Sequence, residues 1–172
     1  NTLGFKVLEG YGLTETSPLV SYNISTNSSN LDSVGKPFSI NEVRIVEGEI
    51  AVKGPNVMLG YYNNPEDTAK VIQDGWFYTG DLGYFDEKGY LYITGRRKEI
   101  IVLPNGKNIN PLEIEEKLLK TEPLYIKEVA IFQDNNVLKA AVYPDLDALA
   151  KDSVINIKEA IRLNTLNNYN NS

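Results

Sequence analysis

The sequence predicts an α+β protein with two parts, a β-rich part over residues 1–97 and a smaller α/β part over residues 98–172. Two observations support this division. Between residues 42 and 96, short runs of β-branched and aromatic residues are separated by glycine-containing turns, as in antiparallel strands. After residue 98, short strand-like runs alternate with an amphipathic segment, as in α/β units.

The first part is predicted to consist mainly of short strands. Residues 5–8 read as the end of a buried strand. Two further strands, 43–46 and 49–53, flank Glu47-Gly48, and this spacing predicts a hairpin.

One helix and a second hairpin complete this part. Pro65 at the first helical position and Asn64 as N-cap predict a helix over residues 65–73. Residues 86–89 lie between two aromatic-rich runs, and Gly89 supplies the positive φ that a short hairpin loop needs.

The second part is predicted to contain a small sheet covered by helices. Asn110, Pro111 and Glu113 form a helix start signal, in which the Asn110 side chain would accept a free backbone N–H. The predicted strands are 100–102, 128–132 and 137–143, and the predicted helices are 111–120 and a weaker one after Asp145. The Asn-rich tail, 164–172, is expected to fray.

Composition excludes several kinds of chemistry. The formal charge of -6 argues against a nucleic-acid surface, which needs clustered Lys and Arg. The chain has no cysteine and no histidine, so neither a thiolate nor an imidazole can act in it. No apolar run approaches the roughly 20 residues that span a bilayer, so a cytoplasmic location is the default expectation.

Thr14 and Glu15 follow Tyr11, which is flanked by Gly10 and Gly12. A hydroxyl and a carboxylate on such a turn can bind phosphate and Mg²⁺, because Mg²⁺ prefers oxygen ligands shared with phosphates. The alternative is a helix-capping Thr14 with a solvated Glu15.

Thr79-Gly80-Asp81 places an acceptor-only carboxylate beside a glycine. That pair suits bidentate contact with the two hydroxyls of a ribose. A structural Asx-turn would explain the same three residues. Trp76, just before them, is assigned to core packing.

Three segments together resemble the adenylate-forming enzymes, which are the acyl-CoA synthetases, the luciferases and the adenylation domains of peptide synthetases. The segments are YGLTETSP at 11–18, GWFYTGDLG at 75–83 and GRRKEIIVLPNGKNIN at 95–110. The resemblance implies that the first part is the small β-barrel-like end of the large adenylating domain. The second part would be the small mobile C-terminal domain. A further matching stretch, 48–61, is interpreted as scaffold.

The resemblance also implies roles for individual residues. ATP or AMP, Mg²⁺ and coenzyme A are the implied ligands. Tyr11 would lie against the adenine beside Gly12, Thr14 would contact the phosphate, Glu15 would bind Mg²⁺, and Asp81 and Arg96 would reach the ribose.

Two more positions match the family's moving parts. Lys98 aligns with the hinge that swings the small domain after adenylate formation, and Gly106 with a turn that passes close to the pantetheine arm of coenzyme A. A solvated basic cluster at Arg97-Lys98 and a plain β-turn at Gly106 are the alternatives.

Two catalytic pieces of the family are missing from the sequence. The phosphate-binding loop would lie upstream of Tyr11, and the C-terminal Gly-Lys motif cannot be present because all 13 glycines lie at or before Gly106. The sequence is therefore expected to be an inactive fragment of a long-chain fatty acid–CoA ligase. Another adenylating enzyme, or a non-catalytic module on the same scaffold, is the alternative. The expected partners are small molecules, with peripheral membrane contact of the longer protein left open.

Overall fold

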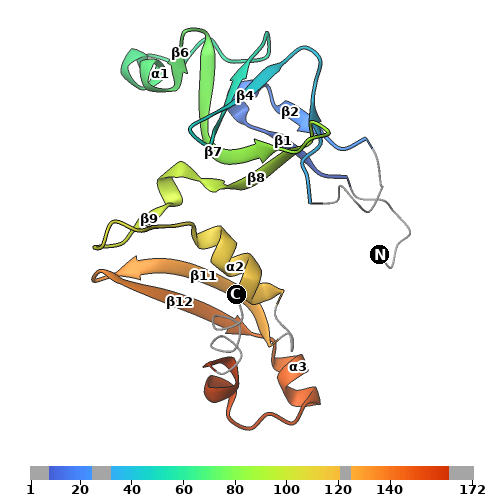
Figure 1. The fold of residues 1–172 in the computed structure, drawn as a ribbon, viewed down its shortest axis with the longest axis vertical. Helices are drawn as coiled ribbons and strands as arrows, with labels where there is room; N and C mark the ends of the chain where they lie inside the picture. Colours follow the sequence, from blue (N-terminus) through green and yellow to red (C-terminus); the bar gives the residue numbers. More distant parts are fainter. Residues whose placement is uncertain (1–7, 25–31, 121–124, 163–172) are drawn as a thin grey trace. The chain divides into compact units, whose positions relative to one another are not determined.

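The computed structural model describes residues 8–24, 32–120 and 125–162. The chain divides into two compact units, Asn1–Lys98 and Glu99–Ser172. Each unit has its own colour range in Figure 1, blue to green for the first and yellow to red for the second. The predicted strand at 5–8 and the predicted tail at 164–172 lie almost wholly outside the described residues.

The first unit contains two antiparallel sheets. A three-stranded sheet has the order β1-β2-β3, and a five-stranded sheet has the order β4-β5-β7-β6 with β8 also paired to β7. The bounds are β1 Gly10–Gly12, β2 Leu19–Tyr22, β3 Lys36–Pro37, β4 Glu42–Val46, β5 Glu49–Lys53, β6 Ile72–Gln73, β7 Trp76–Phe85 and β8 Leu91–Arg96. The short turn η1 Thr14–Thr16 and the helix α1 Pro65–Val71 lie between these strands, and the short turn η3 Arg97–Glu99 follows β8.

The α+β class is confirmed, but the barrel-like closure is wrong. The described strands of this unit form separate open sheets rather than one closed barrel. The reason is the length of the edge strands: β3 and β6 have two residues each, too few to pair across and close a cylinder.

Both predicted hairpins are present. In the β4–β5 hairpin, Glu47 and Gly48 both have positive φ, 50° and 83°, which is the backbone of a tight two-residue turn. In the β7–β8 hairpin, Gly89 has φ 78° and its N–H donates to the carbonyl of Asp86. The helix α1 ends at Val71, two residues before its predicted end, because the next residues pair with β7.

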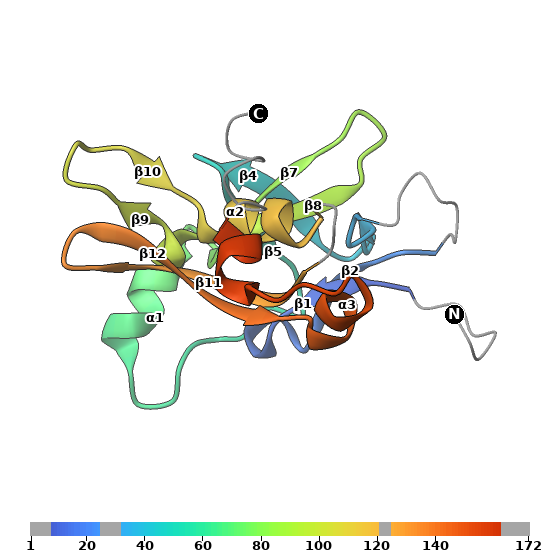
Figure 2. The same ribbon diagram turned by 90° about the horizontal axis from the view of Figure 1, so that it is seen from below.

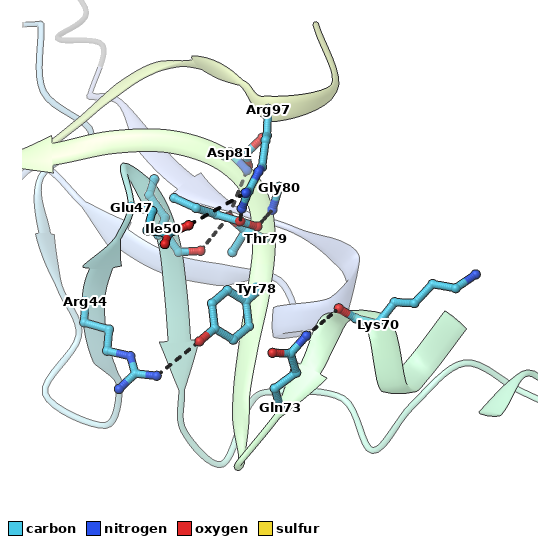
Figure 3. Close-up of polar contacts among 11 residues, drawn as sticks. Arg44, Glu47, Ile50, Lys70, Gln73, Tyr78, Thr79, Gly80, Asp81 and Arg97 are labelled. Carbon is cyan, nitrogen blue, oxygen red and sulfur yellow. Dashed lines mark hydrogen bonds and ion pairs between the residues drawn. The ribbon is translucent and has the colours of Figure 1, made fainter. Parts of the chain in front are cut away.

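The core of the first unit lies between the two sheets. It consists of Tyr11, Val20, Ile50, Val52 and Leu91, each buried. Trp76 is not part of it, so its assignment to core packing is wrong. Its ring is half-buried on the other face of the sheet, with the Arg44 guanidinium 4.0 Å from the ring centroid. The neighbouring Arg44 side chain also donates to the Tyr78 hydroxyl (Figure 3).

The second unit combines two hairpins with helices. The bounds are β9 Ile101–Val102, β10 Asn108–Ile109, α2 Pro111–Leu119, β11 Ile126–Asp134, β12 Val137–Pro144 and α3 Leu146–Lys151. Figure 2 shows the β9–β10 turn and the long β11–β12 hairpin as separate ribbons. Helix α2 packs against β11, where the Glu115 carboxylate accepts the Ile131 N–H at 2.7 Å.

The helix starts differ in how they are capped. Asp145 caps α3 by accepting the Ala148 N–H at 2.9 Å. At α2 the predicted start is confirmed, with Asn110 at the N-cap and Pro111 in the first turn, but the predicted cap bond is wrong. The Asn110 amide donates to the Glu113 carboxylate at 3.3 Å, and its side chain accepts no helix N–H.

Candidate nucleotide site

The centre of the candidate site is the buried carboxylate of Asp81 in β7, whose side chain is 5% exposed. The Tyr11 hydroxyl donates to one of its oxygens at 2.7 Å, and the Arg96 Nε donates to the other at 2.9 Å. Asp81 and Arg96 face each other in the β7–β8 register. The fold thus brings together three residues that the sequence singled out separately.

Burial fixes the protonation state of Tyr11. Removal of the ring from water raises the pKa of the hydroxyl well above its usual range, and the hydrogen bond to the negative Asp81 adds to the rise. The hydroxyl therefore stays a neutral donor. A carboxylate that accepts from a neutral hydroxyl and a guanidinium keeps further lone pairs for a ligand.

The backbone before Asp81 is held by the neighbouring strand. The Thr79 hydroxyl donates to the Ile50 carbonyl at 2.9 Å and accepts the Asp81 N–H at 3.1 Å. Gly80 has φ +76°, a conformation that side-chain-bearing residues rarely adopt. The Asp81 side chain bonds Tyr11 and Arg96 across the fold, which a local Asx-turn does not require.

Thr14 and Glu15 lie on the turn η1, with Thr14 exposed and Glu15 half-buried. Leu13, not Thr14, occupies the N-cap position. The Glu15 carboxylate accepts the Tyr61 hydroxyl at 3.0 Å, and its carbonyl accepts the Met58 N–H at 2.8 Å. This turn is therefore tied to the loop before α1.

Gly12 permits the close approach of two backbone segments at this turn. A Cβ at this position would lie 1.8 Å from the carbonyl oxygen of Pro18. Gly12 therefore contributes to the site by leaving space for the backbone of Pro18. The direction of the η1 turn depends on this close approach.

The stretch interpreted as scaffold contributes residues that sequence reasoning missed. Glu49 is 6% exposed, accepts the Gly80 N–H at 2.8 Å and pairs with Arg97 Nη1 at 2.6 Å. Figure 3 shows Arg97 reaching past Gly80 and Asp81. No sequence pattern marks a single glutamate at the start of a strand as the acceptor of these two bonds. The same is true of Tyr61, whose hydroxyl donates to Glu15.

Arg97 is also more than part of a solvated basic cluster. The hydrogen bond to Glu49 raises the pKa of its guanidinium further, so Arg97 keeps its charge across the accessible pH range. Lys98 next to it is exposed on η3 and is the last residue of the first unit.

Gly106 belongs to the second unit, in the turn between β9 and β10. It has φ +80°, its N–H donates to the Leu103 carbonyl, and a Cβ would meet nothing within 4 Å. The backbone conformation of this position therefore favours glycine. The space where a side chain would lie is open.

The acidic residues of the site suit a magnesium ion that is shared with a ligand. In the described ranges no group of three or more acidic side chains could hold a metal ion by itself. Mg²⁺ usually takes one or two carboxylates and completes its shell with phosphate oxygens and water. Glu15, beside the exposed Thr14 hydroxyl, fits that pattern.

Known proteins resemble this chain in sequence. The AMP-binding enzyme family model matches residues 1–62. A long-chain-fatty-acid–CoA ligase from Bacillus subtilis is 43% identical over 140 residues, which are 74% of this chain and 24% of that protein. The chain belongs to the adenylate-forming superfamily.

Solved structures of the superfamily match the fold as well. The O-succinylbenzoate coenzyme A synthetase of Bacillus subtilis with AMP gives a TM-score of 0.71 at 33% identity, over 86% of this chain and 35% of that one. The same enzyme with ATP and magnesium gives 0.69 at 37% identity, over 81% and 32%. The chain thus spans about a quarter of the first curated relative and about a third of these structures.

Proposed function

We propose that the protein carrying this chain is an ATP-dependent acyl-CoA ligase, and that the first unit forms the adenosine-binding wall of its active site. The observation that carries the proposal is the buried Asp81 carboxylate, held by Tyr11 and Arg96. The two adjacent hydroxyls of a ribose are a pair of donors that one such carboxylate can bind together.

In this proposal each residue acts on a named part of the nucleotide. Asp81 accepts the ribose hydroxyls, Arg96 holds that carboxylate in place by its ion pair, and the Tyr11 ring lies beside the adenine. The Thr14 hydroxyl donates to the phosphate, and Glu15 holds Mg²⁺. When bound there, Mg²⁺ would offset the negative charge of the phosphate oxygens.

The reaction has two halves. The carboxylate oxygen of the acid attacks the α-phosphorus of ATP, which forms an acyl-adenylate and releases pyrophosphate. The coenzyme A thiol then attacks the acyl carbonyl, and AMP leaves. Lys98 would be the hinge between the two states and Gly106 would line the path of the pantetheine arm, so the second unit would be the mobile domain.

A long-chain fatty acid is the first candidate for the acyl substrate, supported by the 43% identity to the Bacillus subtilis ligase. Succinylbenzoate is the second, supported by the fold match to the enzyme of that name. Thioester formation by the full-length protein with palmitate and with O-succinylbenzoate, each with ATP, Mg²⁺ and coenzyme A, separates the two. Activity with neither acid contradicts both candidates.

The nucleotide assignment is tested by Asp81→Asn in the full-length protein. Loss of the charged acceptor should weaken AMP binding by about ten- to a hundredfold, since a hydrogen bond to a charged group contributes roughly 1.5 to 3 kcal/mol. Asp67→Asn is the matched control, because Asp67 is an exposed carboxylate paired with Lys70 on α1. Titration calorimetry with AMP measures both. Equal affinity of Asp81→Asn and wild type means that Asp81 does not bind the ribose.

A further inference from the structure

Glu49 is a buried charged residue with two structural partners. It opens β5 directly after the Glu47-Gly48 turn and is 6% exposed. One carboxylate oxygen accepts the Gly80 N–H at 2.8 Å and the other accepts Arg97 Nη1 at 2.6 Å. Burial of a carboxylate is costly unless it is paired and hydrogen-bonded, and both conditions are met here.

Each partner of Glu49 is the chain neighbour of a residue of the candidate ribose site. Gly80 precedes Asp81 on β7, and Arg97 follows Arg96 at the end of β8. Asp81 and Arg96 are paired directly across these strands. One carboxylate therefore contacts the Gly80 backbone and the Arg97 side chain, on one side of the Asp81–Arg96 pair.

The ion pair alone does not show what this arrangement does for the site. The Arg97 side chain is 57% exposed, so solvent weakens its attraction to Glu49, although loss of a partner would still leave the buried Glu49 carboxylate unsatisfied. The arrangement also has a geometric effect. Gly80 has φ +76°, and nothing lies within 4 Å of where its Cβ would be, so side-chain packing does not hold it in place. The bond from Glu49 is what fixes the direction of its N–H.

We propose that Glu49 is a positioning residue for nucleotide binding: through Gly80 and Arg97 it sets the orientation in which Asp81 and Arg96 meet the ribose hydroxyls. The inference rests on the proposed ribose role of Asp81. Glu49 itself touches no ligand in this arrangement. Its effect is therefore confined to the part of the binding energy that the ribose hydroxyls supply.

The test compares AMP with 2′,3′-dideoxy-AMP, which lacks both ribose hydroxyls. The dissociation constant of dideoxy-AMP divided by that of AMP, both measured with the full-length protein, reports the contribution of the ribose hydroxyls. Glu49→Ala should weaken AMP binding by about tenfold, as is common for residues that orient a binding group. It should leave dideoxy-AMP binding within about twofold, so the ratio falls. Glu49→Gln, which keeps an acceptor for the Gly80 N–H, should recover part of the ratio.

The results distinguish a positioning role of Glu49 from a general structural role and from no role. A proportional loss of both ligands by Glu49→Ala would mean a general structural role, and an unchanged AMP affinity would mean no role; either result overturns the proposal. Asp81→Asn in the same assay should bring the ratio close to one. If Asp81→Asn leaves the wild-type ratio unchanged, Asp81 does not bind the ribose. The inference on Glu49 then fails because the ribose role of Asp81 fails, whatever the Glu49 variants show.

Discussion

At the scale of single residues, the site depends on buried polar groups that satisfy one another. Asp81 and Glu49 are both more than nine-tenths buried, and each accepts from two donors on other elements of the fold. A buried donor or acceptor that loses its partner pays its full desolvation cost. Conservative substitutions here should therefore have measurable effects.

Tyr11→Phe removes one hydroxyl and keeps the ring. The Asp81 carboxylate loses the donor at 2.7 Å, so the protein should be less stable by about 1 to 3 kcal/mol near pH 8. Chemical denaturation of wild type and variant measures the difference. No loss of stability would show that water replaces the hydroxyl without cost.

The same pair of proteins should differ in pH dependence. Burial raises the pKa of folded Tyr11 above the unfolded value of about 10, so folded wild type holds this proton more tightly. The stability that this provides is complete below pH about 10 and declines as pH rises above it. The gap between wild type and Tyr11→Phe should therefore narrow above pH about 10. A gap that stays constant to pH 11 would contradict a buried, neutral Tyr11.

At the scale of elements, glycines of one hairpin meet different constraints. In β7–β8, a Cβ at Gly83 would lie 2.4 Å from the Tyr92 carbonyl oxygen and 2.9 Å from Ile50. A Cβ at Gly89 would meet nothing within 4 Å, but its backbone has φ +78°. Close approach of strands decides the first position, and turn conformation decides the second.

Alanine substitutions at Gly83 and Gly89 should separate the effect of close strand approach from the effect of turn conformation. Gly89→Ala should cost about 1 to 2 kcal/mol for the left-handed backbone. Gly83→Ala should cost more, because the strand pairing itself must shift. Amide hydrogen exchange of peptides covering 76–96 reports the local opening energy. Faster exchange in Gly89→Ala than in Gly83→Ala would contradict this order.

At the scale of the whole molecule, the chain consists of two units that divide after Lys98. Among the described helices, none is long and apolar enough to cross a membrane. Lys98 lies in η3, the short turn that runs from one unit into the other. A hinge at this point would need a backbone with two accessible conformations.

Lys98→Pro in the full-length protein tests the hinge. Proline holds φ near -65° and should trap one orientation of the small domain. Adenylate formation, followed by pyrophosphate exchange, should survive within about tenfold. Thioester formation from preformed acyl-adenylate should fall by more than about 10²-fold, which corresponds to roughly 2.7 kcal/mol.

Lys98→Ala serves as the control, because it removes the charge but leaves the backbone free. Equal loss of both half-reactions in Lys98→Pro would indicate misfolding or a static role. Normal rates for both half-reactions would mean that Lys98 is a solvated surface residue.

The sequence by itself determined the local structure and the family. Turn and cap residues such as Glu47-Gly48, Pro65 and Gly89 act on their immediate neighbours, so the hairpins and α1 could be predicted from them. The segments that resemble the adenylate-forming enzymes could be recognised because their polar residues follow one another along the chain. Element ends were less accurate, as at Val71, where pairing with β7 decides the boundary.

Only the tertiary structure decided which polar groups meet. The contacts of Tyr11 with Asp81 and of Glu49 with Arg97 join residues 70 and 48 positions apart. Their formation depends on strand register and on burial, which no local pattern encodes. The same holds for Trp76, whose ring the fold leaves half-buried beneath Arg44. Burial gives these charges and hydroxyls their strength, because partners inside a fold replace the water that would otherwise weaken them.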